Sequence, residues 1–503
     1  MYRHVRLSVL FVLVAALLSG CVLAPREPET VAEIRLPEPS EEPVNMILGE
    51  KLSSALREVT LYFAAQDGTG FSAVNRSIPR DAGHSLPEAA VETLLDSGAE
   101  RNIRFMADTQ MLACEYACGT VTVNLSIDAR NVQNPQELLA LQTSIGNTLL
   151  DIDGVNGVNV LVGNISESHC QMPLGVQTEP VTSVAAAYAQ LQADRERMLQ
   201  PDGAEQAEPV VRTALLYFPS ETGDWLIPEL RTVSAGKAGF AATLFKLLRD
   251  GPKPGTCAAV SIPEGVELLE PSPAIQTLSS GERVLDLNFS STLVTYMALS
   301  GLEVWKLVGS VALTMCSFLP DLDAVRIMVN SEPITVCERN QIPMEFPEGM
   351  IYRRDFSGCI GSTATLFLVN GEGMLQPVQR AVSMRSALSP RSLLAELILV
   401  GNAGGDLRLP IPEGIQPVDI LGIQTSGGTA RVNLSGNFYR CCQILNAREE
   451  RSLIYAMVNT LCQFDGIRGV RFYVEGQAAE TLAGGIYLKS VLLPNPGIVV
   501  QGR

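Results

Sequence analysis

GVNVLV at residues 157–162, AVRIMV at 324–329 and GVRFYV at 469–474 are three versions of one strand, and they decide the fold of this chain. Each follows a segment in which apolar residues recur with the helical period. Working outward from these strands, the same succession of elements begins near residues 59, 213 and 363. We therefore predict three tandem copies of one unit. A residue type that differs between copies at one position is then a poor candidate for a shared catalytic group.

Each copy has the same predicted order of elements. It opens on a strand of β-branched and aromatic residues, at 59–63, 214–218 and 364–368. A helix follows, and in the first copy Ser85 and Glu88 have the spacing of a capping box. Two strands and a second helix then lead to the closing strand. The order β-α-β-β-α-β predicts an α+β fold of the split βαβ type, with helices on one face of an antiparallel sheet. The second helices bury the apolar sets Leu138, Leu141, Ile145, Leu149; Val304, Val308, Val311, Met315; and Ile454, Met457, Val458, Leu461.

The N-terminus has the pattern of a secretory signal. A basic head with Arg3 and Arg6 precedes an apolar stretch over 7–20, which is shorter than the roughly 20 residues of a membrane span. Leu-Ser-Gly-Cys at 18–21 resembles the lipobox of bacterial lipoproteins. The resemblance implies that residues 1–20 are removed and that Cys21 is diacylated, which anchors the chain to membrane lipid. An uncleaved anchor or an ordinary cleaved signal is the alternative.

The remaining chain divides by composition. Residues 21–55 are rich in Pro and Glu, which predicts a solvated acidic tether. The stretch at 302–319 is apolar but interrupted by polar residues, so we interpret it as a buried core helix. The tail at 482–500 is apolar enough either to add a strand to the third copy or to dock on it. The predicted domains are 56–175, 209–340 and 360–478, with a linker at 176–208 that holds a helix at 184–199 and an extension at 479–503.

Composition limits the partners. The 503-residue chain has a net charge of −17, and an acidic protein is a poor partner for nucleic acid, whose phosphates require Lys and Arg. The same charge argues against adhesion to anionic lipid or wall polymer through bulk electrostatics. An apolar content of 46% is enough for well-formed cores.

Ten cysteines follow Cys21, and an even count in an exported chain suggests disulfides whose pairing the spacing cannot assign. Cys316 and Cys462 match Leu150 of the first copy, so we expect them to serve as apolar core residues. Three cysteines that flank the second copy are candidates for a staple: Cys257, Cys337 and Cys359.

Cys114 and Cys118 could form a local bridge or half of a metal site. With His169 and Cys170 they supply ligands that suit zinc, but their spacing matches no standard zinc site, so no metal and no cofactor is predicted.

Catalytic chemistry finds little support. Only His84 and His169 follow the signal, so a histidine-based device cannot recur in every copy. We expect His84 to be a solvated loop residue. The pattern aligns Asp286 with Asn124 and Asn433, and because Asn cannot act as a general acid or base we predict a structural role at a sheet edge. Turn chemistry accounts for the acidic pairs Asp151/Asp153 and Asp321/Asp323, so no catalytic residue is predicted.

Several motifs together resemble the GerMN domain family of sporulation and spore germination proteins. They are the Leu-Tyr-Phe opening, the Ile-Pro-Glu-Gly turns at 262–265 and 411–414, and the Val-Asn-Leu-Ser strand at 432–435. The resemblance is good in the second and third copies and partial in the first, and a third copy departs from the two that members commonly carry. It implies an exported lipoprotein with a fold like the ring-building modules of sporulation channel and secretion proteins. It implies a supporting role in engulfment, spore-wall formation or germination, and no catalytic residues.

Two hypotheses of function follow. The first is a non-enzymatic scaffold on the extracytoplasmic face of the cell membrane, lipid-anchored at Cys21, that binds other envelope or sporulation proteins or further copies of itself. The second is a module that binds peptidoglycan or a muropeptide in a groove. Its candidate lining is the three aromatic residues at matched positions, Tyr62, Tyr217 and Phe367.

Overall fold

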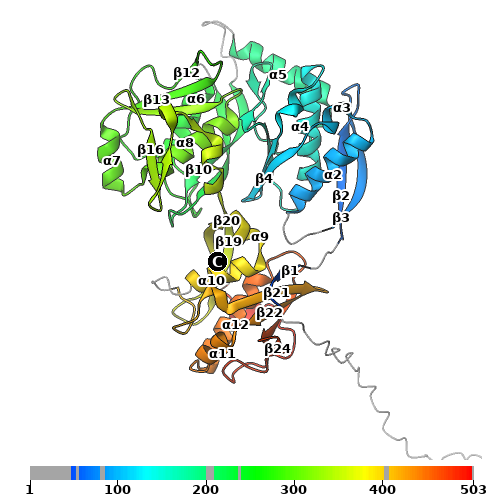
Figure 1. Cartoon of the computed structure of the whole chain (residues 1–503), viewed down its shortest axis with the longest axis vertical. Helices are drawn as coiled ribbons and strands as arrows, with labels where there is room; N and C mark the ends of the chain where they lie inside the picture. Colours follow the sequence, from blue (N-terminus) through cyan, green and yellow to red (C-terminus); the bar gives the residue numbers. More distant parts are fainter. Residues whose placement is uncertain are drawn as a thin grey trace, which may run out of the picture. The chain divides into compact units, whose positions relative to one another are not determined.

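The computed structural model describes residues 47–52, 56–79, 85–199, 209–235, 239–400 and 407–500. The signal peptide, Cys21, most of the predicted tether and His84 lie outside these residues. Figure 1 shows the described chain as a succession of small groups of strands and helices.

The first copy opens on an antiparallel hairpin of β2 (Leu56–Ala64) and β3 (Phe71–Pro79). A small sheet follows, in which β5 is the central strand between β4 and β6. Its β4–β5 pair is antiparallel and its β5–β6 pair is parallel. The other elements are α2 (Leu86–Glu100), α3 (Arg104–Ala107), β4 (Met111–Ala117), β5 (Thr120–Leu125), η1 (Ile127–Arg130), α4 (Pro135–Leu150), β6 (Gly157–Val162), β7 (Ile165–Ser166), β8 (Ser168–His169) and β9 (Met172–Pro173).

The second copy follows the linker helix α5 (Val184–Met198) and repeats this order. A hairpin of β16 and β17 and a 3-10 helix follow its sheet. The elements are β10 (Val210–Pro219), β11 (Leu226–Ala235), α6 (Gly239–Asp250), β12 (Ala274–Thr277), β13 (Arg283–Phe289), α7 (Thr292–Ser300), α8 (Val304–Phe318), β14 (Ala324–Val329), β15 (Glu332–Pro333), β16 (Val336–Arg339), β17 (Ile342–Glu345), η2 (Pro347–Gly349), β18 (Ile351–Tyr352) and η3 (Arg353–Cys359).

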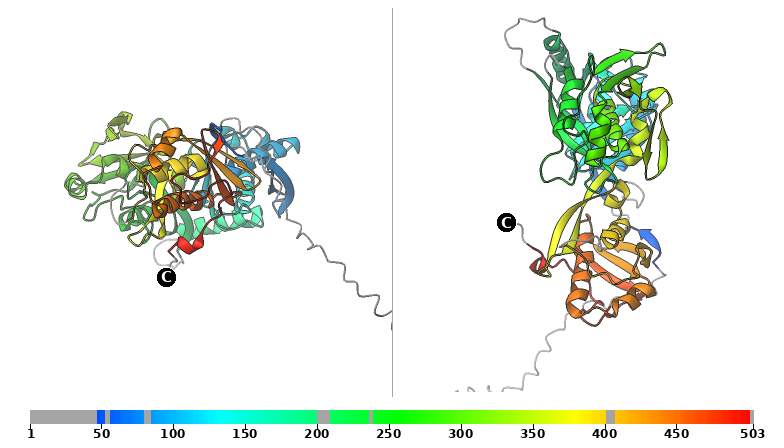
Figure 2. Two further views of the ribbon diagram at one scale, coloured as in Figure 1. Left: turned by 90° about the horizontal axis from the view of Figure 1, so that it is seen from below. Right: turned by 90° about the vertical axis from the view of Figure 1, so that its left-hand side faces the viewer.

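The third copy repeats the order again, and its helices (yellow and orange) lie against its strands (Figure 2). Its sheet is joined at one edge by β1 (Gly49–Lys51), which comes from the N-terminal end of the described chain. The elements are β19 (Gly361–Val369), β20 (Leu375–Ser383), α9 (Met384–Leu388), α10 (Pro390–Val400), η4 (Pro417–Asp419), β21 (Ile420–Ser426), β22 (Thr429–Leu434), α11 (Gly436–Cys442), α12 (Ala447–Leu461), β23 (Gly469–Val474), β24 (Gln477–Ala478) and η5 (Pro496–Ile498).

The predicted α+β class is confirmed, but two details of the predicted unit are wrong. Each copy opens on a hairpin rather than on one strand, because turn residues such as those at 66–69 return the chain antiparallel to itself. Each sheet is mixed rather than antiparallel, because a helix crosses over between its last two long strands and such a crossover makes them parallel.

The helix predictions largely hold. The Glu88 N–H donates to Ser85 Oγ at 3.2 Å and the Ser85 N–H donates to Glu88 Oε2 at 3.3 Å, so the capping box is confirmed. The linker helix is confirmed as α5. Val304 is 40% exposed, because it is the first residue of α8, and its placement in the buried face was wrong.

The apolar stretch at 302–319 is a core helix, as predicted. Every residue of α8 except Val304 and Lys306 is buried. No single described helix is long and apolar enough to cross a membrane, although the bent pair of α7 and α8 meets the criteria of length and composition.

The apolar cores divide unequally among the copies. The described residues between 47 and 500 belong to one compact unit. The first copy has a core of its own residues, among them Leu61, Leu94 and Val123, and the core of the second copy also takes in Leu139, Ala140 and Met172 of the first. The core of the third copy consists of third-copy and tail residues alone. The tail docks on that copy, where Leu482 and Leu488 are buried and Val470 and Leu492 exchange two backbone hydrogen bonds of 2.8 Å.

Candidate functional site

One asparagine holds the same position in all three sheets. Asn124, Asn288 and Asn433 each accept a hydrogen bond from the backbone just after the closing strand, from Asn164, Ser331 and Gly476 at 2.7, 2.8 and 2.8 Å. The strand registers show that Asn288, not Asp286, matches Asn124 and Asn433, so the predicted alignment was two residues out. The Asn-Phe-Ser sequence at 288–290 beside Asn-Leu-Ser in the other copies is the signal that could have revealed this.

Asp286 forms an ion pair with Arg326 and does not serve as a reactive group. Arg326 donates from Nε to Oδ1 and from Nη2 to Oδ2, both at 2.9 Å. The matching residues, Thr122 and Arg431, carry different chemistry. A bidentate pair that only one copy has fixes two neighbouring strands and supplies no shared reactive group.

His169 is 1% exposed, and its Nε2 lies 2.5 Å from Gln142 Oε1. Burial lowers the pKa of His169 to about 4, so the imidazole is neutral at neutral pH. Nowhere in the described chain do three or more His, Cys, Asp or Glu side chains gather as metal ligands. The zinc hypothesis built on Cys114, Cys118, His169 and Cys170 therefore gains no support.

The described cysteines are unpaired thiols in this structure. Cys316 is fully buried, as predicted for a core position, and burial raises its pKa to about 12. Cys462 is half-buried with a pKa raised to about 11 by burial. Cys337 and Cys359 lie in one apolar core with Cys316, and Cys257 is buried outside that core. Thiols with raised pKa values are weak nucleophiles, which argues against a catalytic role.

The three matched aromatic residues do not line a common groove. Tyr217 is 1% exposed, whereas Tyr62 and Phe367 are half-buried. Tyr217 is buried because it lies at the junction of the first two copies, near Arg353 and Glu115. This burial raises the pKa of its phenol.

A buried ion pair forms the centre of that junction. Arg353 of η3 donates from Nη1 and Nη2 to the two carboxylate oxygens of Glu115 on β4, at 3.0 and 2.5 Å, and its Nε donates to Ser317 Oγ at 2.8 Å. Burial opposes the charge on Arg353, but Glu115 and Tyr217 outweigh it and raise the pKa of the guanidinium. The pair is 1% and 9% exposed, so it joins the two copies without offering a surface to a ligand.

The outer edge of the third sheet pairs with a segment from the N-terminal end of the described chain. β1 pairs in parallel with β21, with Gly49 opposite Gly422, Glu50 opposite Ile423 and Lys51 opposite Gln424. We call residues 47–52 the N-terminal arm and the edge of β21 with the start of α10 its seat. The Asn433 Nδ2 donates to the Ile47 carbonyl at 3.0 Å, and the Ile47 side chain is 3% exposed.

The carboxylate of Glu50 meets the start of α10. Ser389 Oγ donates to Glu50 Oε2 at 2.8 Å and the Arg391 N–H donates to Glu50 Oε1 at 3.2 Å. A carboxylate is favoured at a helix N-terminus, where backbone N–H groups lack intrahelical partners. The arm is thus held by backbone pairing, a buried aliphatic side chain and a capped helix.

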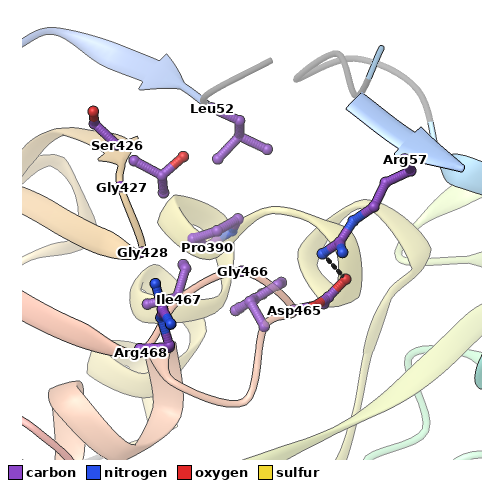
Figure 3. A pocket seen from close by; sticks show the side chains of 12 residues that line it. Leu52, Arg57, Pro390, Ser426, Gly427, Gly428, Asp465, Gly466, Ile467 and Arg468 are labelled. Atoms are coloured by element: carbon purple, nitrogen blue, oxygen red, sulfur yellow. Dashed lines mark hydrogen bonds and ion pairs between the residues drawn. The ribbon is translucent and has the colours of Figure 1, made fainter. Parts of the chain in front are cut away.

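A pocket of about 570 Å³ continues from the end of the arm (Figure 3). Leu52 and Pro390 line it beside the Ser426-Gly427-Gly428 turn. Figure 3 shows Arg57, at the start of β2, reaching Asp465 in an ion pair at the rim. No pattern in the sequence marks this site, because its two parts, residues 47–57 and residues from 389 onward, are more than 330 positions apart along the chain.

Fold and site together define a tandem α+β repeat protein in which the third sheet pairs with the N-terminal arm. The chain belongs to the Germane family, described as sporulation and spore germination, whose model matches residues 60–167, 215–335 and 365–480. The match to this family of sporulation and spore germination proteins confirms the predicted resemblance.

Solved structures include similar proteins. The tandem GerMN domains of the sporulation protein GerM from Bacillus subtilis are 16% identical, with 60% of this chain and 99% of that chain covered and a TM-score of 0.23. The first GerMN domain of the same protein is 16% identical over 26% and 96%, with a TM-score of 0.19. A candidate lipoprotein from Clostridium perfringens is 19% identical over 25% and 88%, with a TM-score of 0.17. No curated protein matches the chain.

Proposed function

We propose that this protein is a non-enzymatic, lipid-anchored scaffold of the cell envelope that acts in sporulation, engulfment or spore germination. Family membership supports the process, and the signal with Cys21 supports export and anchoring. In this proposal the copies dock on other envelope proteins or on each other, in the manner of ring-building modules, and the lipid holds the assembly at the extracytoplasmic face of the membrane.

One observation carries the scaffold function. The three copies keep the residue that fixes the backbone, the Asn at 124, 288 and 433, while neighbouring positions such as 122, 286 and 431 change from Thr to Asp to Arg. A repeated framework with unrepeated side chains suits three binding surfaces of different specificity better than three copies of a reaction centre.

The test is crosslinking in living cells, followed by purification of the acylated protein from membranes and identification of the attached molecules. We expect envelope or sporulation proteins, and we expect Cys21→Ala to release the chain from the membrane fraction. Recovery of wall fragments alone would favour the peptidoglycan-binding alternative. A strictly monomeric protein that recovers no protein partner would overturn the scaffold proposal.

A further inference from the structure

Three equivalent sheet edges can be compared in the described chain, and only one of them pairs with a further strand. The outer edge of β21 carries the N-terminal arm, whereas no described strand pairs with the outer edges of β4 and β12. β4 and β21 match closely, because both have a register irregularity followed by the pairing of Ala113 with Asn124 or of Gly422 with Asn433. The difference in occupancy therefore has a local cause.

That cause is the residue opposite Gly49. A Cβ on Gly422 would lie 2.5 Å from the Ile47 carbonyl oxygen and 2.7 Å from the Gly49 carbonyl oxygen, both of them backbone atoms that cannot swing aside. The first copy has Ala113 at this position, and its methyl group would meet an arm in the same pose. Gly422 thus selects the third copy.

The second copy excludes the arm by another route. Pro271 and Pro273 precede β12 at the corresponding edge. Proline has no backbone N–H, so that stretch cannot donate to an added strand, and edge prolines are a known means of preventing strand addition. Among the three described sheets, only the outer edge of β21 therefore accepts the arm.

The seat also reads the sequence of the arm. Ile47 fills a buried site, and the Glu50 carboxylate caps α10. Gly49 has φ +72°, in the left-handed region that favours glycine. Leu48 is 56% exposed, so its identity is free. The ligand chemistry is an extended segment with an aliphatic residue, any residue, a glycine and a carboxylate in that order.

We propose that the β21 edge of the third copy is a peptide-binding site selective for an extended aliphatic–x–Gly–acidic segment, and that its resident ligand is the N-terminal arm of the same chain. Backbone pairing supplies affinity and the side-chain sites supply selectivity, as in other cases of strand addition. The site gives the third copy a task that the other two cannot perform. It joins the chain that leads to Cys21 to the last copy, although the first copy is nearer in sequence.

The first experiment follows protection of the arm in the full mature chain. We expect hydrogen exchange at 49–51 to be slow and trypsin cleavage after Lys51 to be rare. Gly422→Val should raise the cleavage rate at least tenfold, while the matched control Ala113→Val should leave it unchanged. Glu50→Gln should raise the cleavage rate by less than Gly422→Val does. Because this variant changes only the arm, it keeps the test valid if the Gly422→Val chain does not fold. Equal cleavage in wild type, Gly422→Val and Glu50→Gln would overturn the proposal.

The second experiment supplies the ligand in trans. Ile47→Asp should unseat the arm, and a labelled peptide of residues 46–52 should then bind that full chain, as measured by fluorescence anisotropy. Adding Gly422→Val should weaken binding at least tenfold. Absence of peptide binding to Ile47→Asp, or binding that ignores Gly422→Val, would overturn the site.

Light scattering of the wild-type chain identifies the resident ligand. A monomer with a protected arm supports the arm of the same chain. A dimer that Gly422→Val abolishes would overturn that assignment in favour of the arm of a second copy. These results do not depend on partners recovered from cells, so the site and the scaffold proposal can fail separately.

Discussion

The junction of the first two copies and the third copy solve the same packing problem in opposite ways. The core of the second copy extends into the first, which also has a core of its own, and the two copies bury the Arg353–Glu115 ion pair between them. The third completes its own core and covers its edges with the two ends of the described chain, the arm and the tail. Copies of one structural unit are therefore not equivalent in their stability or in the surface that they offer to partners.

The junction and the third copy differ in how far their contacts can change without loss of the fold. The apolar contacts across the junction make each of the first two copies depend in part on the other for stability, because the surface that both bury would be exposed if either unfolded. A self-contained core allows the peripheral contacts of the third copy to change without loss of its fold. We expect contacts that open and close to lie on the third copy.

The largest effect should come from breaking the junction pair. Glu115→Ala leaves Arg353 charged and buried without its partner, which should cost about 3–5 kcal/mol. Denaturant unfolding should show the loss in the transition of the first two copies and not in that of the third. The double variant Glu115→Ala/Arg353→Met should recover part of the loss, and a double variant no better than Glu115→Ala would contradict this account of the pair.

The first copy should also lose stability at low pH through His169. The pKa is about 4 in the folded chain against 6.5 for the free side chain, so below pH 6.5 the unfolded state takes up a proton that the folded state does not. Stability therefore falls as pH drops from 6.5 towards 4, by up to about 3 kcal/mol from this group. His169→Gln should lose that much less than the wild type over the same range. Parallel pH profiles for the two chains would contradict the prediction.

Docking of the tail should depend on Glu450. Its buried carboxylate accepts the N–H groups of Leu482 and Ala483 at 2.8 Å and of Gly485 at 2.5 Å. Glu450→Gln keeps the shape of the side chain but replaces a charged hydrogen-bond acceptor with a neutral one. This should lower the free energy of unfolding by about 1–3 kcal/mol. Hydrogen exchange at 482–485 should accelerate while the core of the third copy stays protected. Uniform acceleration across that copy would show that the tail is part of its core.

The smallest effect compares two matched threonines. Thr314 Oγ1 accepts the buried Tyr217 N–H at 3.0 Å, whereas Thr460 Oγ1 is buried with no hydrogen-bond partner in the described chain. Thr314→Val should lower the free energy of unfolding by about 1–2 kcal/mol, because it leaves the buried Tyr217 N–H without an acceptor. Thr460→Val should change stability by less than about 0.5 kcal/mol or increase it. Equal losses measured by thermal unfolding would mean that the two copies bury this position alike.

Local sequence was a good guide to the units and a poor one to their connections. The capping box at Ser85, the linker helix and the core helix over 304–318 follow from residues within a few positions of each other. The opening hairpins were missed because turn residues before a helix and within a hairpin look alike in sequence. The alignment of Asp286 failed because a two-residue slip keeps the alternation of a strand intact.

Sequence alone was enough to identify three copies of an α+β unit and an acidic composition, and it predicts an export signal with a lipidation motif at Cys21. These properties depend on short-range patterns and on composition. Only the folded structure shows that the core of the second copy extends into the first, that Arg353 meets Glu115, and that Gly422 admits the arm where Ala113 and Pro273 do not. Such contacts join residues hundreds of positions apart, and a single methyl group or a missing N–H settles them only after the chain has folded.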